Sequence, residues 1–183
     1  LASSISITNF VLNADGACNA GTNYCEAALN DTLFEIQAQK KLLGVSMDSF
    51  PRLSPFARFK NDQLSPLEPR FGGLIRWVPG IGDSNIAKIG SIGQLATLYQ
   101  GVDTTISEAS IAGFFAQSTS SVFAYPQFYG TTLTAIDTTI TNPGLGTLPT
   151  KNYPGWATFI HHNYGTSSEH SVIVRNGTWC SDH

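Results

Sequence analysis

The chain has 183 residues, of which 42% are hydrophobic and 11% aromatic, a length and composition that suit one globular domain. Charged residues make up only 13%, against a usual level of about 25%, and the ten lysines and arginines are scattered except for Lys40 and Lys41. With a net charge of -3, the sequence contains no basic stripe that could neutralise nucleic-acid phosphates, and it has no apolar run of roughly 18 residues that could span a membrane.

Residues 1–30 are expected to form an N-terminal extended arm and a loop. Ile5, Ile7 and Val11 lie on one side of an alternating pattern, which suits a strand or an extended arm. Residues 13–24 are small, polar and rich in turn formers, which indicates a loop. Because the chain begins without a methionine, we expect it to be processed from a longer precursor.

The next segment carries the one clear helix signal in the sequence. Thr32 and Glu35 have the spacing of a capping box, and Gly44 can end the helix after a basic last turn. Four prolines within residues 49–73 exclude a long helix there and predict an extended connection with turns.

From Leu74 onward the sequence is rich in valine, isoleucine, threonine and aromatic residues. Turn-forming residues divide this part into six runs that predict strands, at residues 74–78, 94–99, 121–129, 131–141, 156–163 and 171–179. Residues 138–155 are rich in turn formers and predict one long, irregular surface loop. Many short strands with long polar loops favour an all-β sandwich over residues 31–183, with one or two short helices.

The most suggestive cluster for chemistry lies near the C-terminal end and comprises His161, His162, His170, Asp182 and His183. Neighbouring residues in a strand face opposite sides of the sheet, so His161 and His162 cannot both enter one site without a bulge. We therefore expect polar residues on a strand and its flanking loop, and no metal or catalytic site.

Sequence motifs of common enzyme classes are absent. The run from Gly90 to Gly93 is one residue short of a serine-hydrolase elbow, and the turn at residues 79–83 lacks the lysine and the helix of a phosphate loop. No local context selects a pair for glycoside hydrolysis among the glutamates Glu26, Glu35, Glu68, Glu108 and Glu169. We predict that the chain is not an enzyme and has no catalytic, metal-binding or cofactor-binding residues.

The three cysteines leave at least one thiol unpaired. Cys18 and Cys25 could close a small loop, and a buried free thiol is equally compatible with each position; their spacing does not fit a zinc site. Cys180, close to the chain end, is expected to be incidental and not a nucleophile. Asn30 and Asn176 begin glycosylation sequons, which would be used only in a secretory pathway.

The proline-flanked segment from Leu64 to Val78 (LSPLEPRFGGLIRWV) resembles a segment of the capsid proteins of picorna-like RNA viruses, especially those infecting insects and marine algae. That family has an aromatic residue or arginine, a glycine step and a Gly-hydrophobic-Arg-aromatic strand in the middle of its jelly roll. Those places would be filled here by Phe71, Gly72, Gly73, Arg76 and Trp77. Three further similarities fall in the family's order along the chain. Residues 37–43 resemble its short helix, which precedes this segment, residues 122–129 resemble its aromatic corner, and residues 171–179 resemble its final strand.

The resemblance implies an antiparallel jelly roll that acts as a structural viral capsid subunit in an icosahedral shell. Its expected partners are sister subunits in the virion, with weak or no direct nucleic-acid contact and no membrane span. Sides lined with uncharged polar residues suit such packing because little charge is desolvated. The alternative is a secreted, extracellular β-sandwich that binds or hydrolyses carbohydrate, with Tyr153, Trp156 and Tyr164 stacking on sugar rings. A fibre subunit is a third possibility, although its expected apolar N-terminal helix is not in this chain.

Overall fold

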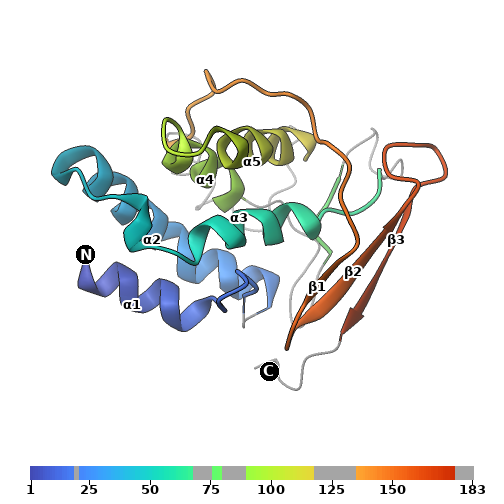
Figure 1. Cartoon of the computed structure of the whole chain (residues 1–183), viewed down its shortest axis with the longest axis horizontal. Helices are drawn as coiled ribbons and strands as arrows, with labels where there is room; N and C mark the ends of the chain where they lie inside the picture. The colour runs from blue at the N-terminus through green and yellow to red at the C-terminus, as the bar shows by residue number, and fades with distance from the viewer. Residues whose placement is uncertain (19–20, 68–75, 80–89, 118–134, 176–183) are drawn as a thin grey trace.

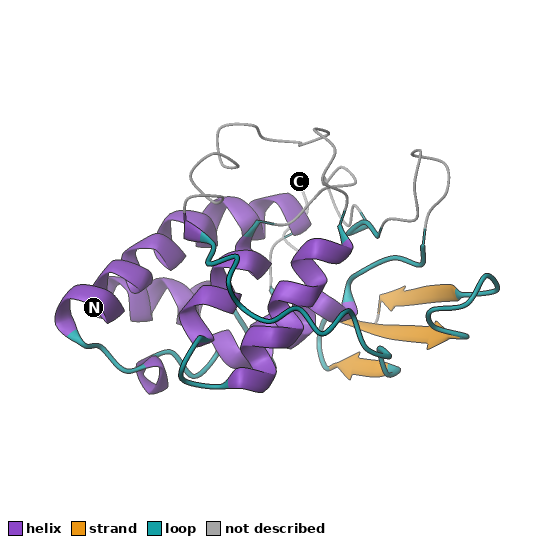
Figure 2. Ribbon diagram, turned by 90° about the horizontal axis from the view of Figure 1, so that it is seen from above, coloured by secondary structure: helices purple, strands orange, loops and turns teal. Residues whose placement is uncertain are grey.

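A computed structural model of the chain describes residues 1–18, 21–67, 76–79, 90–117 and 135–175. Its helices pack together on one side, and a small sheet stands at one end of them (Figure 1). Figure 2 shows the same division from above, with the strands beyond the ends of the helices. The described chain is therefore a mixed α and β structure.

The helices are α1 (Ala2–Val11), α2 (Thr22–Leu43), a 3-10 turn η1 (Met47–Ser49), α3 (Leu53–Asp62), α4 (Ser91–Tyr99) and α5 (Thr104–Ala116). The strands are β1 (Lys151–Tyr153), β2 (Ala157–His162) and β3 (His170–Arg175), which form an antiparallel sheet in the order β1-β2-β3. None of the helices in the described ranges is long and apolar enough to cross a membrane.

The predicted all-β jelly-roll sandwich is wrong, because five α-helices and a single three-stranded sheet make up the described chain. The predicted strand at residues 94–99 belongs to α4. From Ser91 to Leu98 every residue except Thr97 is buried, so this helix has no polar face to mark a helical period. A short apolar run that is buried on all sides cannot be told from a strand by its pattern.

The N-terminal segment also differs from the expected extended arm. Residues 2–11 form α1, which buries the small polar residues Ser4 and Thr8 against α2. Gln39 of α2 donates a hydrogen bond from Nε2 to the Ser4 hydroxyl at 3.1 Å. A helix that buries polar residues lacks the apolar stripe that reveals most amphipathic helices, which is why the sequence did not predict it.

Helix α2 starts ten residues earlier than the predicted capping box. Thr32 lies inside the helix, where its hydroxyl donates to the Ala28 carbonyl oxygen at 3.1 Å, so the capping box is wrong. The predicted end is confirmed: Gly44 has φ 66, in the left-handed region, and its N–H bonds to the Lys40 carbonyl oxygen.

The proline-rich stretch also contains a helix, α3. Pro55 lies in the first turn of α3, where a backbone N–H needs no partner within the helix, so the ring is tolerated there. The proline spacing therefore excluded a long helix correctly but did not exclude this one of ten residues.

Two of the predicted strands are confirmed. Residues 156–163 contain β2, and residues 171–179 contain β3 up to Arg175. The predicted loop at 138–155 is mostly without regular structure and ends in β1. The predicted strand at 121–129 and the key glycines of the capsid-like segment lie outside the described residues.

An aromatic cluster joins the sheet to the helices. The ring centre of Phe59 in α3 lies 4.9 Å from the ring centre of Tyr153 and 4.9 Å from that of Trp156, edge to face in both cases. It lies 6.1 Å from the ring centre of Phe159. Elsewhere α3 approaches α5 closely at Gly113, where a Cβ atom would stand 1.9 Å from Oδ1 of Asn61. The rings packed on Phe59 thus join the sheet to α3, and the Gly113 approach joins α3 to α5.

Candidate functional site

The outer face of the sheet carries exposed apolar side chains, and Phe10 in α1 and Leu42 and Leu43 at the end of α2 are exposed as well. The pairing places Ile160 opposite Val172 on the face that points away from the helices. These side chains are 39% and 50% exposed, and Val174, next along β3, is 45% exposed. β3 pairs with β2, and among the described residues no strand pairs with its other edge.

The histidines of the sheet divide between its two faces. His162 and His170 are paired on the exposed face, with ring centroids 4.7 Å apart, whereas His161 is half-buried on the face toward α3. The structure thus keeps His161 away from its neighbour, as strand alternation predicts. No group of three or more metal-ligating side chains occurs among the described residues; Asp182 and His183 lie outside them.

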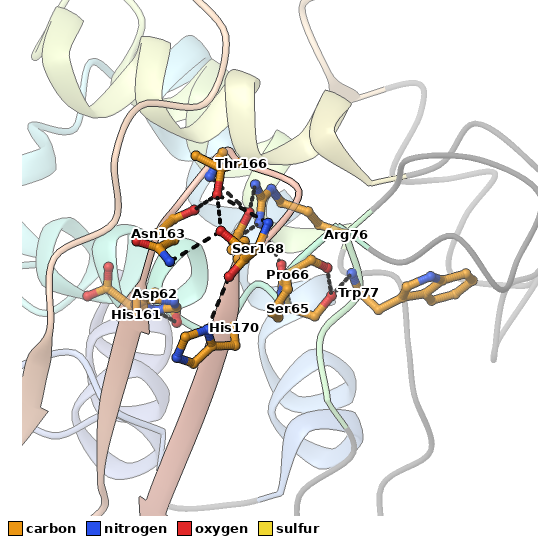
Figure 3. Close-up of polar contacts among 12 residues, drawn as sticks. Asp62, Ser65, Pro66, Arg76, Trp77, His161, Asn163, Thr166, Ser168 and His170 are labelled. Carbon is orange, nitrogen blue, oxygen red and sulfur yellow. Dashed lines mark hydrogen bonds and ion pairs between the residues drawn. The ribbon is translucent and has the colours of Figure 1, made fainter.

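On its inner side the sheet meets the end of α3 through a polar network (Figure 3). The Tyr153 hydroxyl donates to Oδ2 of Asp62 at 2.6 Å, and Nε2 of His161 lies 3.1 Å from the Asp62 carbonyl oxygen. A carbonyl oxygen only accepts, so Nε2 carries the proton. Nδ1 is then the unprotonated nitrogen, and it is buried without a hydrogen-bond partner in the described structure.

Burial controls the ionisation of this network. It raises the pKa of Asp62 to about 6, against a lowering by the Tyr153 hydrogen bond and by Lys151 and Arg58. It also lowers the pKa of His161, although the hydrogen bond to the Asp62 carbonyl opposes this. The imidazole is therefore neutral near pH 7, and the network is held by hydrogen bonds and not by a charge pair.

A buried ion pair lies beside this network. Arg76 donates from both terminal nitrogens to Glu169, at 2.6 and 2.9 Å, and its guanidinium lies 4.2 Å from the ring centre of Tyr164. Burial raises the pKa of Glu169, but the hydrogen bonds from Arg76 and the Gly165 N–H, together with the charge of Arg76, lower it overall. The pair ties the β2–β3 turn to the segment before α4, which identifies it as a structural clamp.

We expect Asp62→Asn to remove a pH dependence from folding stability. The folded-state pKa of about 6 lies above the ordinary 3.8, so the folded protein binds this proton more tightly than the unfolded chain. The stabilisation that comes from this tighter proton binding is fully present below about pH 4 and is lost as the pH rises to about 6. The loss in the free energy of unfolding is at most about 3 kcal/mol. In urea titrations between those pH values, the wild type should lose this stability and the variant should not. Parallel pH profiles would contradict the assignment.

A second polar cluster is sealed in the core between α2, α3 and α4. Nζ of Lys60, which is fully buried, lies 3.0 Å from Oε1 of Glu26. The Ser91 hydroxyl donates to the same oxygen at 2.7 Å, and the Ser91 N–H donates to Oε2 at 3.2 Å. Cys25 borders the cluster: burial raises the pKa of its thiol, and the Lys60 charge lowers it only in part. A thiol held protonated in the interior is a poor nucleophile.

The side chains expected to stack on sugars are not available for that role. Tyr153 and Trp156 are each 1% exposed and belong to the aromatic cluster on Phe59. The half-buried ring of Tyr164 is covered by the Arg76 guanidinium. This removes the residues on which the carbohydrate-binding alternative depended.

Lys60 and Asp62 were not predicted as functional residues from the sequence. A signal for the first was present, because Lys60 continues the buried i, i+3, i+4, i+7 stripe begun by Leu53, Phe56 and Ala57. A lysine on such a stripe must be buried with a partner. For Asp62 no local pattern exists, since Tyr153 lies 91 residues away.

Comparisons of this chain with protein-family models, with curated proteins and with solved structures found no match.

Proposed function

We propose that the chain is a structural subunit that associates with further copies of itself through the edge of β3 that faces away from β2. The observation that carries the proposal is the composition of this edge. Val172, Ile173 and Val174 follow one another in a strand without proline, lysine or acidic residue; its one charged residue, Arg175, stands at its end, and all six residues pair with β2 without a bulge. Native proteins usually protect a free strand edge with one of these features.

A second copy is the expected occupant because the edge is complementary to itself. Antiparallel strands match when residues on the same face stand opposite one another. A two-fold axis at Ile173 would place Val172 opposite Val174 of the second copy on the outer face. The new pair would continue the apolar row of Ile160 and Val172, and it would bury no charged side chain at its centre.

The low charge of the chain supports self-association. Charged residues are 13% of the sequence and the net charge is -3, so copies repel one another weakly. One strand edge buries much less than the roughly 1,600 Å² of a stable interface. We therefore expect a weak single contact that becomes stable only when several contacts act together.

A structural role is favoured over catalysis by the state of the polar groups. In the described residues, Lys60 and Glu26 form an ion pair in the core, and Arg76 and Glu169 form another. Neither leaves a free nucleophile beside an open cavity. The capsid role stays a prediction from sequence resemblance alone, and the jelly roll that it implied is not the fold of this chain.

The proposal is tested by sedimentation velocity between about 10 µM and 1 mM, the range in which contacts of this size dissociate. The wild type should show concentration-dependent association. Val172→Lys combined with Val174→Lys should weaken that association at least about tenfold, because it places like charges opposite one another across the two-fold axis. Both side chains already face solvent, so the circular dichroism spectrum should not change.

The matched control is Val102→Lys, which introduces the same charge at an equally exposed valine (52%) in the turn after α4. It should associate as the wild type does. A wild type that remains monomeric over the whole range would refute the proposal. So would a control that weakens association as much as the β3 variant.

A further inference from the structure

Histidines from two strands meet on the outer face of the sheet. His162, the last residue of β2, is paired with His170, the first residue of β3, and both side chains are exposed. Their ring centroids lie 4.7 Å apart and the ring planes are inclined at 38°, so the rings do not lie flat against each other. Strand alternation separates His162 from its neighbour His161, but cross-strand pairing brings it together with His170.

The spacing of the two rings is the spacing that a shared metal ion requires. An imidazole nitrogen binds an ion such as Zn²⁺ at about 2.0 Å, which places the ring centre about 3.1 Å from the ion. Two such rings at an angle of about 90–110° around the ion have centres about 4.4–5.1 Å apart. The observed 4.7 Å lies within this range, so the pair can hold an ion with little movement of either strand.

The tautomer of His170 suits metal binding. Its Nδ1 lies 3.1 Å from the Ser168 carbonyl oxygen (Figure 3). A carbonyl oxygen only accepts, so Nδ1 carries the proton and Nε2 has the unshared electron pair that a metal ion needs. A backbone carbonyl bonded to the other ring nitrogen orients a metal-binding imidazole and raises its basicity.

The turn between the two strands holds the pair in place. Asn163 has φ 51, in the left-handed region that asparagine tolerates better than most residues, and its carbonyl oxygen accepts from the Thr166 hydroxyl at 2.7 Å. The Ser168 hydroxyl accepts from the Asn163 side-chain amide at 3.2 Å, and Glu169 is fixed by Arg76. The two imidazoles therefore project from an internally bonded hairpin.

We propose that His162 and His170 form a binding site for a divalent transition-metal ion, with Cu²⁺ bound most tightly and water completing the coordination. No third metal-ligating side chain joins them among the described residues, so binding should be weak and exchangeable. Arg175, the one charged residue of β3, stands at the far end of the strand opposite Ala157 and does not repel the ion. The site lies on the face of the sheet and not on the edge of β3, so it does not depend on the proposed association.

The test is a copper titration of the folded full chain. Cys180→Ser and His183→Gln are introduced first, so that the end of the chain contributes neither a thiol nor an imidazole. At about pH 7.5 this parent should bind one Cu²⁺ per chain at concentrations between about 1 µM and 1 mM. Its electron paramagnetic resonance spectrum should show coordination by a pair of imidazole nitrogens.

His162→Gln and His170→Gln should each weaken copper binding at least about tenfold, because one imidazole then remains. Both side chains are exposed, so the circular dichroism spectrum should not change. The matched control is His161→Gln, which makes the same change at the adjacent residue on the face toward α3 and should keep the copper affinity.

Two results would overturn the proposal. The first is a parent spectrum that shows fewer imidazole nitrogens than this pair supplies. The second is a weakening in folded His161→Gln as large as in the other variants, or no weakening in any of them. If His161→Gln does not fold, the parent spectrum and the two exposed variants still decide.

Discussion

Replacement of Lys60 by methionine is expected to lower the free energy of unfolding by about 3–5 kcal/mol, because the Glu26 carboxylate then stays buried without its cation. The Lys60 side chain is 0% exposed and that of Glu26 is 15% exposed. Glu26 cannot turn away easily, since it also accepts two hydrogen bonds from Ser91 at the start of α4. Urea unfolding at pH 7, followed by circular dichroism, measures the loss.

The double variant Lys60→Met with Glu26→Gln separates the charge effect from the packing effect. It replaces the ion pair by neutral side chains of similar volume and should recover most of the stability, because a buried pair adds little beyond neutral packing. Lys41→Met, at an exposed lysine in the last turn of α2, should stay within about 0.5 kcal/mol of the wild type. A double variant less stable than Lys60→Met would contradict this account.

The parts of the fold that the sequence predicted are those with a local cause. Richness in β-branched and aromatic residues between turn formers predicted β2 and β3, and the freedom of Gly44 to adopt positive φ predicted the end of α2. Helix α4 was missed because tertiary burial removes its helical period, and α1 because its buried face is polar. In both helices the partner elements, and not the local sequence, decide the structure.

The candidate site shows the same limit. Strand alternation correctly separated His161 from His162, which argued against a metal site there. The sequence could not predict that β3 lies at an edge of the described sheet, because this depends on whether another strand pairs beside it. Its apolar run from Val172 to Val174 is equally compatible with a buried central strand. The resemblance to capsid proteins predicted a jelly roll, but it did not rest on local features of the residues that form the helices.

Phe59→Ala is expected to destabilise the protein by about 3–5 kcal/mol, because it removes the ring on which the sheet packs. Phe59 is fully buried and contacts three aromatic residues, Tyr153, Trp156 and Phe159, in edge-to-face arrangements. No neighbouring side chain from the sheet can fill the space without moving the strands. The loss should be visible in urea unfolding, and Phe10→Ala, at a phenylalanine that is 84% exposed, is the matched control with little expected change.

The same variant distinguishes packing from association. Phe59 lies on the inner side of the sheet and does not reach the edge of β3, so it acts on association only by holding the sheet in place. At a temperature where Phe59→Ala remains folded, we expect its association to be weakened less than by the lysines at Val172 and Val174. Those lysines, in turn, should leave the urea midpoint of the monomer nearly unchanged, because both side chains face solvent. If Phe59→Ala cost less than about 1 kcal/mol, the aromatic cluster would not be what holds the sheet on α3.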